Sequence, residues 1–319
     1  MTEITESNVL KLKLTSSPHI HSKWSTEKVM WMVVLALVPC TISSLIFFGI
    51  RQLLIIAVSV AFAAGTEYAV RKIRKQENSI GDGSAIITGL LLALILPPDF
   101  SLSSTAIGAV VAIAIGKEVF GGLGFNIFNP ALVGRAFLQA AFPVPMTTWV
   151  KPDFAVDAVS SATPLSAFKF DKMITDIKPM LLGNTAGSLG ETSAIAVLIG
   201  GVFLISIGIV NWRIPVSILL GVFCFGGLFS IFGSFPGPVF HIFAGGLLFG
   251  AFFMATDWVT SPITAKGMWI YGFGIALMLV IVRLFGGLPE GVMYSILFMN
   301  ALVPLINKFT RPVVFGEAV

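Results

Sequence analysis

The sequence predicts an all-α polytopic membrane protein with about ten transmembrane helices, built as two inverted five-helix repeats with one long extracytoplasmic loop. The first observation is composition: 56% of the 319 residues are hydrophobic, 11% are charged and the mean hydropathy is +0.94. Soluble proteins carry about 25% charged residues. This composition argues against a soluble enzyme, a disordered chain or a nucleic-acid-binding protein, despite a net charge of +4.

The second observation is the regular spacing of apolar segments. A transmembrane helix needs about 20 apolar residues, and ten such spans leave room only for short connections. Two of the expected spans, 84–98 and 103–118, are short and have Gly or Pro near their ends, so we expect broken or tilted helices there. The expected spans are 29–50, 53–70, 84–98, 103–118, 127–142, 193–210, 213–232, 240–256, 267–285 and 290–306.

The distribution of basic residues predicts the orientation. No apolar signal-peptide core follows the polar first 28 residues, so the N-terminus is expected in the cytoplasm. The segments that are then cytoplasmic hold 13 of the 20 Lys and Arg residues, whereas the short outer loops hold only Arg51 and Arg283. Positive charge collects on the cytoplasmic side. We therefore expect both termini inside and the 143–192 loop outside.

The third observation is internal similarity. The stretch FGGLGFNIFNPALV at 120–133 is similar to FGGLPEGVMYSILFMNALV at 285–303, and each follows a Gly-Leu-Leu run that ends at Asp99 or Asp257. Two five-span halves must have opposite orientations, as in transporters built from inverted repeats. The predicted parts are a cytoplasmic segment 1–28, a repeat 29–142, the loop 143–192, a repeat 193–306 and a cytoplasmic tail 307–319.

The long loop contains the motif that carries chemistry, DAVSSATPLSAFK at 157–169. The pattern Asp-x-x-Ser-x-Ala-Thr, here Asp157, Ser160, Ala162 and Thr163, resembles the acceptor motif for covalent flavin attachment. In that chemistry a flavin transferase joins the phosphate of FMN to the threonine hydroxyl as a phosphoester. An acceptor hydroxyl needs an accessible loop and small neighbours, so we expect the Thr163 hydroxyl to be exposed. The alternative is an ordinary turn, with Asp157 capping a helix that begins near Ser160.

The resemblance extends over nearly the whole chain. The stretches SSPHIHSKWSTEKVM at 16–30, GDGSAIITGLLLALILPP at 81–98, GKEVFGGLGFNIFNPALVGRAF at 116–137 and MATDWVTSPIT at 254–264 are similar to one family. That family is the D subunit of the Rnf ion-translocating ferredoxin:NAD oxidoreductase, with its homologue the B subunit of the sodium-pumping NADH:quinone reductase. The family commonly has proline where this chain has Trp258, so we expect the local backbone to differ from the family's at this position.

The resemblance implies an electron-transfer subunit of an oxidoreductase that is not catalytic alone. Electrons would pass from ferredoxin to NAD, coupled to sodium or proton translocation across the cytoplasmic membrane of a prokaryote. FMN would be carried on Thr163, with the A, B, C, E and G proteins of the Rnf complex as partners and a flavin transferase for maturation. A non-covalent riboflavin in the bundle is also implied, and no residue is assigned to it.

Polar residues within the expected spans are further candidates. Intramembrane carboxylates are costly and often functional, but Glu67 has Arg71 four residues away, and Glu118 lies where solvation is easy. Arg135 has three open interpretations: pairing with a flavin phosphate, contact with a partner, or extension to the membrane surface. Asp99 and Asp257 are interpreted first as caps of broken helices, with a central cavity as the alternative. Asn129 and Asn300 match across the repeat, and each is expected to cap a helix start or, in a half-helix site, to contact a cofactor or ion.

Other interpretations of the chain stay open. Cys40 and Cys224 each lie alone in an apolar run and cannot supply the four thiolates of an iron–sulfur cluster. His19, His21 and His241 are interpreted as non-ligands. A cofactor-free channel on the same repeat, or a structural membrane anchor, is the alternative function. The acceptor motif distinguishes these, because a channel has no need of it.

Overall fold

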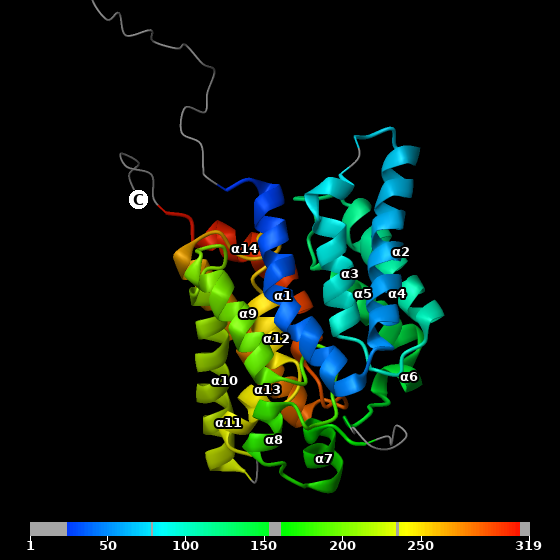
Figure 1. Cartoon of the computed structure of the whole chain (residues 1–319). Coiled ribbons are helices and arrows are strands. Elements are labelled where there is room, and N and C mark those ends of the chain that lie inside the picture. The colour runs from blue at the N-terminus through cyan, green and yellow to red at the C-terminus, as the bar shows by residue number, and fades with distance from the viewer. Residues whose placement is uncertain (1–23, 78, 153–160, 234–235, 313–319) are drawn as a thin grey trace, which may run out of the picture.

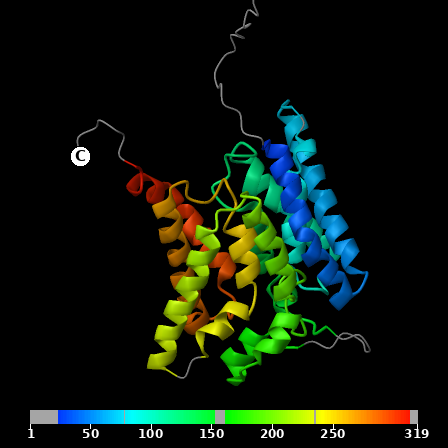
Figure 2. The same ribbon diagram turned by 60° about the vertical axis from the view of Figure 1, so that its left-hand side comes forward.

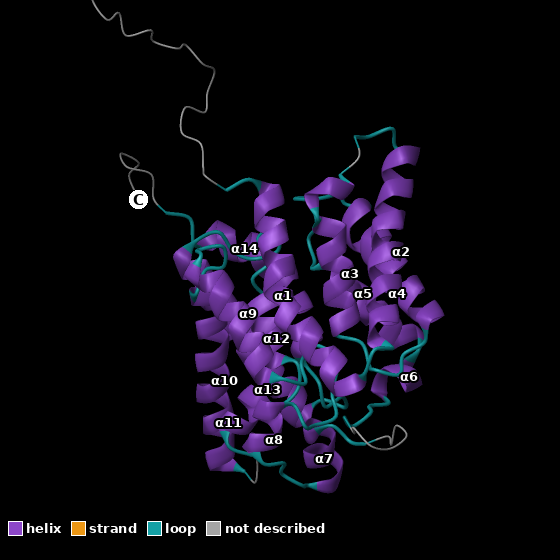
Figure 3. Ribbon diagram, in the orientation of Figure 1, coloured by secondary structure: helices purple, strands orange, loops and turns teal. Residues whose placement is uncertain are grey.

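The computed structural model describes residues 24–77, 79–152, 161–233 and 236–312. Helices make up the fold, and these ranges contain no β-strand (Figure 3). Five helices are long and apolar enough to cross a membrane: α1 (Thr26–Phe48), α2 (Gln52–Ile73), α10 (Arg213–Phe232), α13 (Ala265–Phe285) and α14 (Val292–Phe309). The chain is therefore a multi-pass membrane protein, as its composition predicts.

Shorter helices occupy the other expected spans. Within 84–98 the helix α3 stops at Leu94, before Pro97 and Pro98, whose rings cannot continue it. These shorter elements are α3 (Ser84–Leu94), α4 (Leu102–Ile113) with the π-helical turn η2 (Ala114–Glu118), α5 (Pro130–Ala141), α9 (Ala194–Ser206), α11 (Pro238–Phe243), and α12 (Leu247–Phe249) with the π-helical turn η3 (Gly250–Met254).

The segment expected as a long loop is partly helical. It contains α6 (Pro143–Thr147), α7 (Pro164–Asp171) and α8 (Ile177–Leu182). All three lie at one end of the bundle in Figure 1, and the start of α1, the end of α14 and the connection after α2 lie at the other end. A 3₁₀ turn, η1 (Ile80–Asp82), belongs to that connection.

The two halves pack in the same pattern. Helix α4 packs against α2 and α5, and its counterpart α13 packs against α10 and α14. The halves meet where α1 packs on α9 and α5 on α14, each helix against its own counterpart. Figure 2 shows α1 and α2 on one side of the molecule and α10, α13 and α14 on the other. This pattern agrees with a repeat; its inversion across a membrane stays a prediction.

The core between the halves is apolar and closely packed. Leu92, Leu94 and Leu96 are fully buried at the broken end of α3, and the connection before α9 pairs with it through backbone bonds from Leu189 to Leu96 and from Gly190 to Leu94. Backbone groups released by a broken helix must find partners in a membrane protein. The broken helices therefore end inside the protein, where side chains from both halves converge.

Candidate functional site

Thr163 is the N-cap of α7. Its hydroxyl oxygen accepts a hydrogen bond from the backbone N–H of Ser166 at 3.2 Å and lies 2.9 Å from the Ser166 hydroxyl. Pro164 occupies the first helical position, where a missing N–H costs nothing. The expected acceptor is thus held in a defined geometry by the residues that follow it in the motif.

The expectation that the Thr163 hydroxyl is exposed was wrong. Thr163 is 4% exposed, whereas its neighbour Ala162 is exposed. The physical reason is that Thr163 satisfies a helix end, which draws its side chain inward. The nearest described helix, α7, begins at Pro164 with Thr163 as its cap, and the alternative of a helix capped by Asp157 near Ser160 falls outside the described residues. Asp157 and Ser160 themselves lie outside the described residues.

A cavity of about 410 Å³ opens beside this cap, and we refer to it as the α7 cavity. Its size lies within the range of about 300–1,000 Å³ that is usual for cofactor and ligand sites. Its walls combine aromatic, polar and charged side chains from the first half, the intervening segment and the second half. They include Arg135, Gln139, Trp149, Ser161, Ala162, Ser166, Phe170, Glu290 and Tyr294.

Arg135 is paired within the protein. Its guanidinium donates to a carboxylate oxygen of Glu290 at 2.5 Å, and Arg135 is only 7% exposed. Of its three open interpretations, extension to the membrane surface is wrong, because the side chain turns inward to meet Glu290. Composition and spacing did not single out Glu290. Its position within FGGLPEG, the second copy of the repeated stretch, is the signal that marks it.

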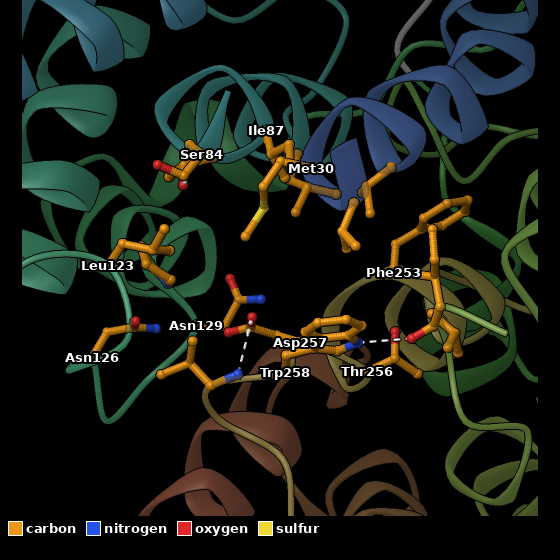
Figure 4. A pocket seen from close by; sticks show the side chains of 18 of the residues that line it. Met30, Ser84, Ile87, Leu123, Asn126, Asn129, Phe253, Thr256, Asp257 and Trp258 are labelled. Carbon is orange, nitrogen blue, oxygen red and sulfur yellow. Dashed lines mark hydrogen bonds between the residues drawn. The ribbon is translucent and has the colours of Figure 1, made fainter. Parts of the chain in front are cut away.

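A second cavity, of about 100 Å³, lies between the broken helices, and we refer to it as the interior cavity. Figure 4 shows Met30, Ser84, Asn126, Asn129 and Asp257 around it, from both halves of the chain. The N-terminal end of α5 faces the interior cavity, and Asn129 caps that end by accepting hydrogen bonds from the N–H groups of residues 131 and 132. Polar groups thus line an otherwise apolar space at the centre of the molecule.

The aspartates and the unusual tryptophan have distinct local roles. Asp257 accepts from the Thr260 hydroxyl at 3.0 Å and from the backbone of residue 259, so it holds the turn between η3 and α13, whose caps are Ala255 and Thr264, rather than capping a helix itself. Asp99 instead forms an exposed ion pair with Arg51 at 2.6 Å. Trp258 donates to the carbonyl of Ile209 at 2.7 Å and lines the interior cavity, so it connects the segment after η3 to the turn that follows α9.

The matched asparagines are neighbours at the centre, where the side-chain amide group of Asn300 lies 3.2 Å from the backbone nitrogen of Asn129. The amide nitrogen of Asn129 donates to the Met254 carbonyl at 3.3 Å, which satisfies the last turn of η3. Asn300 lies within α14 rather than at a helix start, and its amide is 2.6 Å from the Tyr271 hydroxyl. One asparagine therefore caps a helix, while its counterpart joins two helices side by side.

A buried charged cluster lies at the opposite end of the molecule from α7. Lys117 donates to Glu67 and to the Ser84 hydroxyl, both at 2.6 Å, and Arg71 lies 3.6 Å from Glu67 and 3.5 Å from Glu118. The pairing of Glu67 with Arg71 was expected, but the easy solvation of Glu118 was wrong. Glu118 is 1% exposed, because the η2 turn directs it inward.

Comparison with known proteins decides the family. Residues 13–316 match the model of the NQR2, RnfD, RnfE family. The chain belongs to that family. It is 48% identical, over 95% of its length and 96% of the relative's, to the D subunit of the proton-translocating ferredoxin:NAD(+) oxidoreductase complex of Clostridium ljungdahlii.

Two other relatives of the NQR2, RnfD, RnfE family are similar over most of their length. The D subunit of the Na(+)-translocating ferredoxin:NAD(+) oxidoreductase complex of Acetobacterium woodii is 43% identical, over 97% of this chain and 96% of the relative. The D subunit of the ion-translocating oxidoreductase complex of Actinobacillus succinogenes is 38% identical, over 95% of this chain and 98% of the relative. The family resemblance carried by the sequence motifs is confirmed.

Proposed function

We propose that this chain is the D subunit of an Rnf-type complex and carries FMN as a phosphoester on Thr163, as a membrane electron-transfer subunit. The complex would couple electron transfer from ferredoxin to NAD with translocation of sodium or protons. The α7 cavity is the observation that carries the proposal. It places Ala162 of the acceptor motif, three aromatic side chains and the Arg135–Glu290 pair around one space of cofactor size.

The residues at the α7 cavity fit a phosphate-linked flavin. A phosphate on the Thr163 oxygen would lie at the N-terminus of an eight-residue helix, where backbone N–H groups and the helix dipole favour negative charge. Trp149, Phe170 and Tyr294 line the cavity and offer apolar surface to an aromatic ring. Bound there, a flavin supplies one- and two-electron chemistry, and the protein sets its position and surroundings.

The buried hydroxyl sets a condition on attachment. Thr163 must release its contacts with Ser166 before a transferase can reach the oxygen, so α7 has to open at its first turn. The partners under this proposal are the A, B, C, E and G proteins of the Rnf complex and the flavin transferase. The 143–192 segment would lie outside the cytoplasmic membrane, with both termini in the cytoplasm.

The interior cavity is the place where a non-covalent riboflavin would bind. Asn126, Asn129 and Asp257 offer amide and carboxylate groups to the polar edge of a flavin ring, and Trp258 and Phe253 offer apolar contact. At about 100 Å³ the space is smaller than a typical cofactor site. Flexible side chains such as Met30 would therefore have to move aside.

The test of the covalent flavin compares three variants expressed with the flavin transferase. Thr163→Asn keeps a good helix cap but has no hydroxyl to esterify, so we expect a folded protein without covalent flavin. Thr163→Ser keeps a hydroxyl, and Thr148→Val removes an exposed hydroxyl elsewhere in the segment. The measurement is in-gel flavin fluorescence after denaturation, with the mass of the peptide around Thr163.

The expected result is fluorescence, with a mass increase of FMN less one water, in the unmodified protein and in Thr148→Val but not in Thr163→Asn. Covalent flavin that persists in Thr163→Asn would refute the assignment of Thr163. A dark, unmodified protein in every case would instead favour a cofactor-free channel or a structural anchor.

A further inference from the structure

Glu290 lies where three cavities meet. It lines the α7 cavity together with Ala162, a small cavity with Thr163, and a third small cavity between α5 and the end of α13. It sits in the connection between α13 and α14, outside the long apolar helices. Among the described residues, Glu290 is the carboxylate that lines all three of these cavities.

Charged and titratable groups from several elements lie around Glu290. Arg135 of α5 pairs with it at 2.5 Å, and Arg283 of α13 and Glu191 of the connection before α9 line the same third cavity. Tyr294 of α14 lines the α7 cavity beside it. From α7, Lys169 donates to three carbonyls of the neighbouring chain segment, those of residues 283, 286 and 288.

The two arginines are not equally free to stabilise a carboxylate. Arg283 uses two donors on the carbonyls of His241 and Ala244, at 2.5 and 2.8 Å. Glu191 accepts from the N–H of Ser188 and lies so close to Gly246 that an added Cβ there would overlap its carboxylate oxygen. Glu191 is thus fixed as a second negative charge near Glu290, and Arg135 is the cation in direct contact with it.

These surroundings place Glu290 close to the balance between its two protonation states. Desolvation of a side chain that is 26% exposed and the nearby Glu191 carboxylate raise its pKa, while Arg135 and Arg283 lower it, and the net result is a pKa of about 7 instead of 4.5. A raised pKa means that the protein binds this proton more tightly than an exposed glutamate does. Small changes of charge in the α7 cavity are then sufficient to change the fraction of Glu290 that is protonated near neutral pH.

We propose that Glu290 is a proton-holding residue that responds to the charge of the flavin at Thr163. When electrons add negative charge to the cavity, a carboxylate oxygen of Glu290 binds one proton from water. The ion pair with Arg135 becomes a hydrogen bond to a neutral acid, and the guanidinium charge is released toward the cavity. No covalent bond of the protein breaks, and the electrons stay on the flavin.

This inference rests on the proposed function and deepens it. Arg135 belongs to the first repeat and Glu290 to the second, so protonation also changes a contact between the halves. Glu290 acts through the charge of the cavity and is a positioning residue rather than a catalytic one. Its signature is therefore a pH dependence, which loss of a merely structural contact would not produce.

The first experiment measures the midpoint potential of the covalent flavin against pH. We compare the flavin-bearing protein with Glu290→Gln and with Glu77→Gln, which removes an exposed carboxylate at the other end of the bundle. Between pH 6 and 8, around the pKa of about 7, the midpoint potential of the unmodified protein and of Glu77→Gln should fall more steeply with pH than that of Glu290→Gln. Equal slopes in all three proteins, with flavin attached, would overturn the proposal.

The second experiment needs no flavin. In the Thr163→Asn protein, pH-difference infrared spectroscopy should show a buried carboxyl group that titrates near neutral pH. Glu290→Gln should abolish that band, and Glu290→Asp, which keeps a carboxyl group, should shift it. If no such group titrates in the folded protein, the inference about Glu290 fails while the attachment of flavin to Thr163 stands. If flavin never attaches but the band is present, the proposed function fails instead.

Discussion

Lys117 and Glu67 form an ion pair that neither side chain shares with solvent. Lys117 is 2% exposed, Glu67 is fully buried, and 2.6 Å separates the ammonium nitrogen from the carboxylate oxygen. A hydroxyl group of Ser79 also donates to Glu67. Two charges are tolerated in such a place only because each satisfies the other.

Removing one member of this pair should be costly. We expect Lys117→Met to lower the free energy of unfolding by about 3–5 kcal/mol, because it leaves the Glu67 charge buried without its nearest partner. The measurement is thermal unfolding in detergent. Lys266→Met, which replaces an exposed lysine at the start of α13, is the matched control and should change little. Equal melting temperatures for the two variants would show that Arg71 alone compensates Glu67.

At the scale of single residues, sequence reasoning predicted roles that depend on local neighbours. Asn129 precedes a proline at a helix start, and it caps that helix. The Glu67–Arg71 pair follows from a spacing of four residues. Glu290 and Lys117 were missed as partners because their contacts join residues 155 and 50 positions apart. A pattern within one segment does not contain that information.

At the scale of elements, a very close approach between the halves occurs at α1 and α9. Gly200 of α9 lies so near α1 that an added Cβ would overlap the carbonyl oxygen of Ala36. Small residues at helix contacts let backbones approach closely in membrane proteins. This contact joins two helices that are counterparts in the repeat.

A single methyl group should therefore disturb this contact. We expect Gly200→Ala to cost about 1–3 kcal/mol through overpacking. Gly65→Ala is the matched control, because Gly65 in α2 has open space where its Cβ would lie, and alanine favours a helix. Chemical or thermal unfolding compares the two. A Gly200→Ala protein as stable as Gly65→Ala would show that α1 and α9 can separate without cost.

The elements themselves were largely predictable, and their ends were not. Each of the ten expected apolar segments contains helix, although only five described helices are long and apolar enough to cross a membrane, and the prolines at 97 and 98 indicated a broken helix. The π-helical turns η2 and η3 were missed, because a π-helical turn differs from an α-helix by one inserted residue rather than by composition. The short helices α6, α7 and α8 escaped notice because they are only 5, 8 and 6 residues long, too short for a helical repeat of apolar residues to be seen.

At the scale of the whole molecule, the two ends of the bundle are formed by different segments of the chain. One end holds the start of α1, the end of α14 and the connection after α2; the other holds α6, α7 and α8 (Figure 1). An excess of basic residues at the first end predicts that it faces the cytoplasm. The arrangement of the helices agrees with that assignment, since it keeps the acceptor segment away from both termini.

Labelling of single introduced cysteines should show which end of the bundle faces which side of the membrane. With Cys40 and Cys224 replaced by alanine, we expect Lys178→Cys in α8 to react with a membrane-impermeant maleimide in intact protoplasts. Lys75→Cys, after α2, should react only once the membrane is opened. Both lysines are exposed, so access to the reagent depends on the side of the membrane. Labelling of both positions from the same side would contradict the predicted topology.

The helix cap at Thr163 has a consequence for the order of events during biosynthesis. A hydroxyl that already completes a helix is a substrate for modification only in moments when that helix is frayed. Loss of an N-cap costs about 0.5–2 kcal/mol, so such fraying recurs continually rather than rarely. Under the proposed attachment, newly made chains would mature at a pace set by the fraying of one turn. Once esterified, the Thr163 oxygen would hold the FMN at the N-terminus of α7, whose first turn would have formed again.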